Sequence, residues 1–304
     1  MKINIIIDFM HIYYKYFFEK KYNKIGKLTA PVEINGVNIE KDTTLIYHSI
    51  RDIENVRAQF EREGHYVVMN ICFDSKPTFR AEIDSEYKAK RVHELTEDNH
   101  NEVNYIMELL KKAGHNVHRK DGYESDDLVT DICQRYKDKF DFTVIYTNDK
   151  DLAINVCDKV TVLRFKQKQG YSQIKVSNYE QYLSNEFGAR IPYNSIGLYL
   201  STKGDTPDGI KGIKGFGNKA FDKLMDSIKD RDIDWSRCGD YNYLESVMDS
   251  LKDILNEQQF NEMKHSFKLV RSMNPELGEI QFSKSTVELR EEAYKYLGMI
   301  SLIH

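Results

Sequence analysis

Four short apolar runs recur through the first 165 residues, and polar stretches with helical periodicity separate them. The runs lie at residues 3–7, 67–73, 142–146 and 160–165. Short apolar runs joined through helical segments are typical of βαβ units, whose strands are parallel and buried on both faces. The pattern therefore predicts an α/β fold with a mainly parallel sheet flanked by helices.

The second half of the chain has a different pattern. From about residue 178 onward it is helical, with a Gly-rich interruption at 204–217. We therefore predict a sheet domain over residues 1–176 and a helical domain over residues 177–304, which the length of the chain allows. Within the first domain, residues 80–120 have a helical pattern crowded with charge. Such a stretch is typical of either a solvated helix pair or a ligand-contacting element.

Composition limits the functional class. A net charge of −4 gives no overall basic character, so contact with nucleic acid must come from local patches. The four cysteines stand singly, without zinc spacing, so we expect reduced thiols in a reducing cytoplasm. The N-terminus has no signal-peptide pattern, and no apolar stretch approaches the ~20 residues of a membrane span. We therefore expect an unexported protein without membrane contact.

Acidic side chains follow the predicted strands or begin the segments that come after them. They are Asp8, Asp74, Glu124, Asp126, Asp127, Asp149, Asp151, Asp205 and Asp208. Each of them alone could be a turn residue or a helix cap. Because parallel strands end at one edge of a sheet, the acids are expected to lie together, where they would repel one another unless cations neutralised them. The joint pattern favours a metal site.

The donor types indicate which metal. Carboxylates without His or Cys ligands suit Mg²⁺ or Mn²⁺ rather than zinc. Nine acids exceed what one octahedral ion needs, and two ions ~4 Å apart are the usual apparatus for in-line attack on a phosphodiester. An EF-hand around Asp149 is excluded because Ala153 and Ile154 stand at its fifth and sixth positions. The nucleophile-elbow and P-loop motifs are both absent.

Basic residues accumulate after Asp74, at Arg80, Lys88, Lys90 and Arg91. On a helix, Lys88 and Arg91 would share a face and could contact one phosphate or two adjacent ones. A solvated helix face is an equally good interpretation of this charge pattern.

A second basic region has a more specific form. Gly215-Phe216-Gly217 predicts a tight turn between two helical segments, with Lys219 in the first turn of the second helix. This is the form of a helix-hairpin-helix, at about residues 204–224, whose backbone N–H groups hold duplex phosphates without reading sequence. A glycine turn that joins two packed helices is the alternative.

Five segments of the chain resemble the 5′ nuclease or flap endonuclease family, particularly its stand-alone bacteriophage and bacterial type. They are "IIIDFMHIYYK", "CFDSKPTFRAEIDSEYKAKR", "GYESDD", "TNDKDLAINV" and "KGDTPDGIKGIKGFGNKAF", in the order of the family, within residues 3–221. The resemblance implies a PIN-like sheet, a helical arch at about residues 80–120 that admits single-stranded DNA, and a helix-three-turn-helix that holds the duplex. We expect a monomer.

The resemblance also implies roles for single residues. Asp8, Asp74, Glu124, Asp126 and Asp127 resemble ligands and near ligands of a first metal, and Asp149, Asp151, Asp205 and Asp208 those of a second. The implied DNA contacts are Lys15 (where the family usually has Arg), Arg80, Lys88, Arg91, Gly215, Gly217 and Lys219. Lys88 and Arg91 match a pair that steers the scissile phosphate, and a potassium ion is expected at the hairpin. The departures from the family pattern are Phe9, Asn148 and Gly209.

The activity that the resemblance implies is two-metal phosphodiester hydrolysis. The substrates would be 5′ ends and 5′ flaps of DNA, or of RNA annealed to DNA, in primer removal during phage or bacterial replication, alongside replication proteins. Two alternatives stay open. A PIN-domain endoribonuclease would share the acids but would not need the glycine turn, and a catalytically silent protein would bind branched DNA without cutting it.

Overall fold

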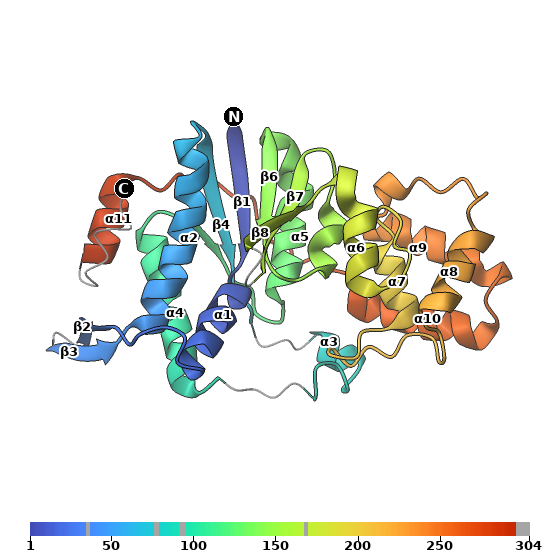
Figure 1. Cartoon of the computed structure of the whole chain (residues 1–304), viewed down its shortest axis with the longest axis horizontal. Coiled ribbons are helices and arrows are strands. Elements are labelled where there is room, and N and C mark those ends of the chain that lie inside the picture. Colours follow the sequence, from blue (N-terminus) through green and yellow to red (C-terminus); the bar gives the residue numbers. More distant parts are fainter. Residues whose placement is uncertain (35–36, 76–78, 91–94, 167–169, 296–304) are drawn as a thin grey trace.

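The computed structural model describes residues 1–34, 37–75, 79–90, 95–166 and 170–295. Its main sheet contains β1 (Lys2–Asp8), β4 (Tyr66–Cys72), β5 (Asn116–His118), β6 (Phe142–Tyr146), β7 (Val160–Lys166) and β8 (Gly170–Ile174). The strand order is β5-β4-β1-β6-β7-β8, of which Figure 1 labels all but β5, and within this sheet only β7 and β8 pair antiparallel. The predicted α/β fold with a mainly parallel sheet is therefore confirmed.

All four apolar runs of the sequence are strands of this sheet: β1, β4, β6 and β7. The sequence pattern does not predict β5, which has only three residues, or β8, a half-exposed edge strand. It also misses the separate antiparallel hairpin of β2 (Thr29–Ile34) and β3 (Val37–Asp42). These strands lack the continuous apolar run by which a strand buried on both faces is recognised.

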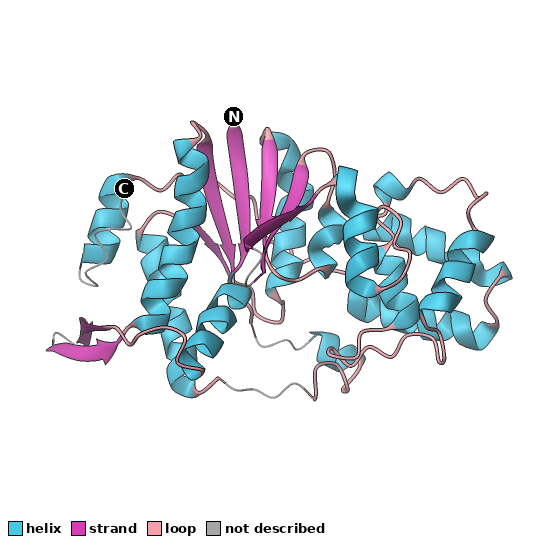
Figure 2. Ribbon diagram, viewed as in Figure 1, coloured by secondary structure: helices cyan, strands magenta, loops and turns pink. Residues whose placement is uncertain are grey.

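Helices cover both faces of the sheet (Figure 2). One face carries α1 (Phe9–Lys21), α2 (Thr44–Arg62), α4 (Glu97–Lys112) and α11 (Val287–Tyr294), and the other carries α5 (Ser125–Tyr136). Successive side chains of β1 point to opposite faces of the sheet and so contribute to the hydrophobic core on both: Ile5 and Ile7 face the α1 side, and Ile6 faces the α5 side. None of the described helices is both long and apolar enough to cross a membrane.

The helical region continues the core on the α5 side. It contains α6 (Tyr179–Phe187), α7 (Ile196–Lys203), α8 (Asn218–Ser227), α9 (Tyr241–Asp249) and α10 (Glu257–Val270). After α10 the chain returns to the sheet: the Phe282 ring lies 4.9 Å from that of Tyr136, and α11 packs against α4. The last described helix, α11, therefore lies beside the sheet (Figure 1), whereas the sequence pattern predicts a helical domain from residue 177 onward.

The segment expected to form a helical arch is only partly helical. It contains α3 (Phe79–Ile83), then turns through residue 90, and then α4. The prediction that Lys88 lies on a helix is wrong, because Lys88 has a φ of 53° and its backbone N–H donates to the Asp208 carbonyl at 2.8 Å. The Asp84 side chain, which accepts from the Glu86 N–H at 2.9 Å, starts the turn. Arg91 lies outside the described residues.

Candidate carboxylate metal site

The acids singled out in the sequence gather at the carboxyl-terminal edge of the sheet. This carboxylate cluster comprises Asp8, Asp74, Glu124, Asp126, Asp127, Asp149, Asp151, Asp205 and Asp208. Asp8 ends β1, Asp74 lies two residues after β4, and Glu124 precedes α5. The acids are close enough to repel one another across these segments: Asp8 repels Asp74, and Asp149 repels Asp8. The sheet topology thus brings together residues that are far apart in the sequence.

Asp8 is the most enclosed of the acids that carry no ion pair. Its carboxylate accepts the Ser125 hydroxyl at 2.8 Å and the Thr147 hydroxyl at 2.9 Å, and the residue is 9% exposed. Burial, together with repulsion from Asp149, raises the pKa of Asp8 to about 6. The sequence reasoning missed Ser125 and Thr147. The available signal is their position, one between two acids and the other directly after a strand.

The start of α5 arranges three acids by helix capping. Glu124 is the N-cap, and its N–H donates to the Asp127 carboxylate at 3.1 Å, which closes a capping box. The N–H of Ser125, which has no partner within the helix, donates to the Asp74 carboxylate at 2.7 Å. Acids at a helix start are favoured by the unpaired N–H groups and the helix dipole. The helix-cap interpretation and the metal-site interpretation therefore apply to the same residues.

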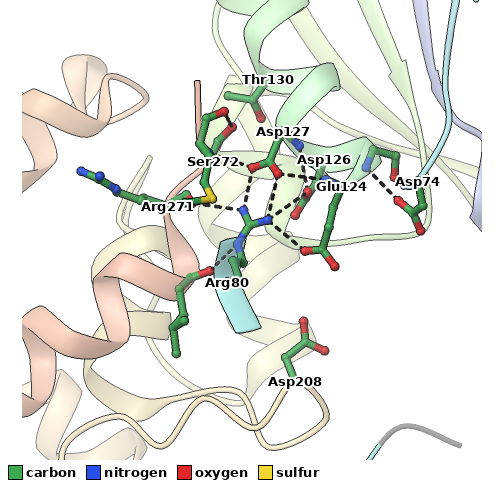
Figure 3. Close-up of polar contacts among 12 residues, drawn as sticks. Asp74, Arg80, Glu124, Asp126, Asp127, Thr130, Asp208, Arg271 and Ser272 are labelled. Atoms are coloured by element: carbon green, nitrogen blue, oxygen red, sulfur yellow. Dashed lines mark hydrogen bonds and ion pairs between the residues drawn. The ribbon is translucent and has the colours of Figure 1, made fainter. Parts of the chain in front are cut away.

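Arg80 is buried beneath this helix start (Figure 3). Its guanidinium donates to Glu124 at 2.9 Å and to both Asp127 oxygens at 2.7 and 2.9 Å. It also donates to the carbonyls of Leu269 at 3.0 Å and Arg271 at 3.1 Å, and is only 3% exposed. The expected DNA contact by Arg80 therefore does not fit the structure, since its donors already hold partners inside the protein.

The same contacts bear on Asp127. Its carboxylate is fully buried and accepts from Arg80, from the Glu124 N–H and from the Met273 N–H at 2.8 Å. With its charge balanced by Arg80, Asp127 supports the start of α5 and is not open to an ion. This corrects the expectation that Asp127 is a metal ligand, and leaves it among the near ligands.

Lys88 lies between Glu124, at the start of α5, and Asp208, in the loop after α7. Its ammonium pairs with Glu124 and lies 3.7 Å from the Asp208 carboxylate. Although burial would raise it, the nearby Lys88 and Arg80 hold the pKa of Glu124 below its ordinary value. The loop that carries Asp208 can come this close because Gly209, at φ 75°, has no side chain: a Cβ there would lie 2.4 Å from the Glu86 carbonyl oxygen. The departure from the family pattern at Gly209 thus has a local cause.

The other two departures also have local explanations. The Phe9 ring stacks on that of Phe73, with centroids 4.3 Å apart, and is fully buried. The Asn148 side chain accepts from the Phe165 N–H at 3.0 Å, which fixes the loop after β6. Neither side chain displaces an acid.

Asp149 and Asp151 begin a short helical turn, as their spacing allows. The Asp149 N–H donates to the Thr147 hydroxyl and the Asp151 N–H to the Asp149 carboxylate, both at 2.9 Å. Burial and repulsion from Asp149 raise the pKa of Asp151 well above its ordinary value. One Asp151 oxygen is buried without a hydrogen-bond partner, and a cavity of about 30 Å³ is lined by Asp126, Asp149 and Asp151.

The donor set fits divalent cations. In the part of the chain that the structure describes, no three His, Cys, Asp or Glu side chains are placed to hold one ion as they stand. However, the oxygens are of the hard type that Mg²⁺ and Mn²⁺ prefer. The raised pKa of Asp8 shows that its negative charge is unfavourable in the protein as it stands. Among the described residues, the Asp151 oxygen that accepts no hydrogen bond has only the Lys150 ammonium, 3.8 Å away, as a countercharge.

The remaining predicted DNA contacts among the described residues lie at two places, on α1 and at the start of α8. Lys15 pairs with Asp52 at 2.9 Å and lies 4.0 Å above the Phe165 ring, so its ammonium is held inside the protein. Gly215, Gly217 and Lys219 line an open hollow at the start of α8, at the end of a long loop that follows α7. Contact of these residues with DNA stays a prediction.

Comparison with known proteins assigns the chain to a family. Residues 4–185, more than half of the chain, match the family of the 5′-3′ exonuclease N-terminal resolvase-like domain. The chain belongs to the 5′-3′ exonuclease family. It is 32% identical over 195 residues to DNA polymerase I of Borreliella burgdorferi, a match that covers 63% of this chain and 20% of the polymerase. It is 31% identical over 160 residues to a 5′-3′ exonuclease of Mycoplasma pneumoniae, covering 52% of each.

The chain therefore spans at most about half the length of these relatives. Solved structures cover more of it. The 5′-exonuclease of bacteriophage T5 with bound zinc superposes with a TM-score of 0.58 at 14% identity, over 99% of this chain and 96% of that one. The bacteriophage T5 flap endonuclease in complex with DNA and metal ions gives 0.55 at 15% identity, over 99% and 95%. At such identities the likeness shows a shared fold.

Proposed function

We propose that this member of the 5′-3′ exonuclease family is a divalent-metal-dependent nuclease that cuts DNA at 5′ ends and 5′ flaps, and RNA annealed to DNA. The observation that carries the proposal is the carboxylate cluster, in which acids from separate strands and loops meet at one sheet edge, and burial and mutual repulsion raise the pKa of Asp8 and Asp151. Carboxylates in this arrangement can hold divalent cations, and such cations stabilise the negative charge that builds up on the attacking and the leaving oxygen during phosphodiester hydrolysis.

The residues divide into two groups that would each hold one Mg²⁺ or Mn²⁺. The first group is Asp8, Asp74, Glu124 and Asp126, and the second is Asp149, Asp151, Asp205 and Asp208. When bound, such ions activate water and stabilise the leaving oxygen. Ser125 and Thr147 orient the Asp8 carboxylate, and Arg80 with Asp127 fixes the helix start that carries Glu124 and Asp126.

Lys88 is proposed to act on the substrate. Its ammonium lies between Glu124 and Asp208, one from each group, so a phosphate bound between the groups would lie within its reach. As a charged donor it would stabilise the negative charge of the reacting phosphate. Arg91, expected to share this role, lies three residues further along the chain.

The duplex part of the substrate would be held by the loop before α8. The N–H groups at Gly215 and Gly217 and the ammonium of Lys219 are proposed to contact phosphates without reading sequence, and backbone carbonyls of this loop to hold a potassium ion. Since the relatives include DNA polymerases, we place the reaction in primer removal during bacterial or phage replication. Lys15, paired with Asp52, would need to leave that partner to reach a phosphate.

The decisive experiment replaces Asp149 and Asp151 with Asn and follows cleavage of a 5′-flapped duplex in Mg²⁺. We expect the rate to fall at least about a thousandfold, or ~4 kcal/mol in the barrier, while flap binding is retained. Asp138→Asn is the matched control, because it removes an exposed acid paired with Lys159 at the other end of the strands. Unchanged cleavage by the double variant would overturn the proposal.

Two further substrates separate the alternatives. Preferential cleavage of free single-stranded RNA over the flapped duplex would point to an endoribonuclease. Tight flap binding by the wild-type protein with no product in Mg²⁺ or Mn²⁺ would point to a catalytically silent binding protein.

A further inference from the structure

Three aromatic rings form a ladder along α1, away from the carboxylate cluster. Tyr14, Phe18 and Tyr22 are spaced four residues apart, so they lie on one side of the helix. Successive ring centroids are 6.2 and 6.4 Å apart, with interplanar angles of 23° and 16°. Phe18 is 37% exposed and Tyr22 is 61% exposed. Exposed aromatic side chains in a row are unusual on a protein surface and indicate a binding partner.

Lysines accompany this ladder. Residues 14–28 contain five lysines and a single acid, Glu19, in a chain whose net charge is −4. Two of the five already pair with acids, Lys15 with Asp52 and Lys20 with Asp42. The ammonium of Lys21 lies 5.9 Å from the centroid of the Phe18 ring, and that of Lys24 lies 5.9 Å from the centroid of the Tyr22 ring. Rings for stacking combined with cations for phosphates are the means by which proteins bind single-stranded nucleic acid without sequence preference.

The ladder has a fixed relation to the catalytic edge. α1 begins directly after Asp8, and Tyr22 caps its far end. At 1.5 Å per residue, the 14 steps from Asp8 to Tyr22 span ~21 Å. Figure 1 shows α1 leading from the lower edge of the sheet toward α4 and away from the helical region. A single strand of nucleic acid that passes the carboxylate cluster on the α1 side of the sheet would therefore run along the rings.

We infer that Phe18 and Tyr22, with Lys24, form a track for the single-stranded 5′ tail of the substrate. The bases would stack on the two exposed rings while Lys24 contacts the backbone. This inference rests on the proposed nuclease function, since it assigns a path to the strand that the cluster would cut. It predicts a measurable quantity of its own, the gain in affinity that a longer tail provides.

The test compares duplexes with 5′ tails of about 4 and about 16 nucleotides, the span of typical single-strand sites. Binding is followed by fluorescence anisotropy in chelator, so that no substrate is cut. The wild-type protein should bind the longer tail more tightly. Because one stacked base contributes ~1–3 kcal/mol, the Phe18→Ala, Tyr22→Ala double variant should lose at least about fivefold of that gain, with binding of the short-tailed duplex unchanged.

A charge variant and a matched control complete the design. Lys24→Glu should also reduce the gain from the longer tail and flatten its salt dependence. Tyr66→Ala should change nothing: Tyr66 is 48% exposed and lies 5.0 Å from the Lys284 ammonium, but it begins β4 at the opposite end of the strands.

The outcomes separate the two proposals. If the wild-type protein cuts flaps in Mg²⁺ and the double variant keeps the full gain from the longer tail, the inferred track is wrong and the exposed rings serve another partner, such as a protein. If the wild-type protein cuts no flap under any divalent ion, the proposed function fails, whatever the tail dependence.

Discussion

Two regions of the molecule bury carboxylates in opposite electrostatic states. On the α2 side, Glu54 is 2% exposed and accepts from the His115 ring and the Tyr294 hydroxyl, each at 2.7 Å, and from Arg57. Although burial would raise it, His115 and Arg57 lower the pKa of Glu54 to about 2. We call Glu54, Arg57, His115, Arg290 and Tyr294 the Glu54 cluster. It joins α2 to α11.

Asp8 shows the opposite state. It is nearly as buried, but its hydrogen bonds come from two neutral hydroxyls, and its pKa is raised to about 6. The difference shows how to separate structural from functional acids. Where the chain supplies the cation, the carboxylate stabilises the fold; where it does not, the fold tolerates a cost that an external cation can remove.

The largest effect is expected from Asp8→Asn. The neutral amide removes one negatively charged ligand from the carboxylate cluster. The rate of cleavage should therefore fall at least about a thousandfold, or ~4 kcal/mol in the activation barrier. Without metal, the free energy of unfolding should rise, because a desolvated charge is gone while the amide oxygen can still accept a hydroxyl. Flap cleavage and denaturation in chelator measure the two changes. Retained activity, or a loss of stability, would show that Asp8 behaves like Glu54.

The corresponding change on the other side is Glu54→Gln. It leaves the buried Arg57 and Arg290 without their shared carboxylate, so the free energy of unfolding should fall by about 3 kcal/mol. Cleavage per folded molecule should be unchanged well below the melting temperature. Denaturant titration checks the first expectation, with the exposed Asp138→Asn as control. A loss of cleavage by folded Glu54→Gln would remove the proposed distinction.

The pH dependence of stability sharpens the comparison, because the two shifts have opposite signs. Folding raises the pKa of Asp8 from 3.8 to about 6. Its stabilising contribution to the free energy of unfolding is therefore fully present below pH 3.8 and is lost as pH rises through 6. The Glu54 pKa falls from 4.5 to about 2, so its contribution is present above pH 4.5 and is lost as pH falls through 2. Each shift corresponds to about 3 kcal/mol, since one pKa unit is ~1.36 kcal/mol.

The free energy of unfolding in chelator should therefore be highest near pH 4 or just below it, as measured by denaturant titration across pH. Asp126 and Asp151 add to the Asp8 side, because burial raises the pKa of both. Asp8→Asn should reduce the slope between pH 4 and 6, and Glu54→Gln the slope between pH 2 and 4.5. If both substitutions changed the pH dependence of stability in the same pH range and to the same extent, the assignment of the two slopes to Asp8 and Glu54 would be wrong.

The sequence predicts the sheet and the meeting of the acids for one reason. Strands buried on both faces must be apolar, and parallel strands must end at the same edge, so Asp8, Asp74 and Asp149 can be placed together without coordinates. The caps at Asp149 and Glu124 also follow from local rules. These inferences use only neighbours along the chain and the direction of the strands.

Other features depend on long-range packing that periodicity does not encode. Arg80 bonds to residues from 44 to 191 positions away, so its burial cannot be inferred from its charge. Lys88 leaves the predicted helix because its N–H meets the Asp208 carbonyl, across a contact that only Gly209 permits. The return of α11 to α4 also depends on Glu54, whose partner Tyr294 is 240 residues away.

The smallest effect is expected from Ser125→Ala, which acts on Asp8 through one hydrogen bond. The hydroxyl that donates to Asp8 is lost, whereas the Ser125 N–H, which donates to Asp74, remains. Groups that orient a metal-binding carboxylate typically contribute 10- to 100-fold in affinity, and Thr147 still holds the other oxygen. Mn²⁺ binding, followed by calorimetry, should therefore weaken by about tenfold, or ~1.4 kcal/mol.

Ser201→Ala is the matched control for this variant, because Ser201 is also buried but donates to the Gly197 carbonyl within α7. It should leave Mn²⁺ affinity unchanged. Because Ser125→Ala removes a hydrogen bond that lowers the pKa of Asp8, that pKa should rise further, so the loss of Mn²⁺ affinity should be larger at pH 6 than at pH 8. An equal loss at both pH values would mean that Ser125 positions the carboxylate without tuning its charge. No loss in either condition would leave Asp8 oriented by Thr147 alone.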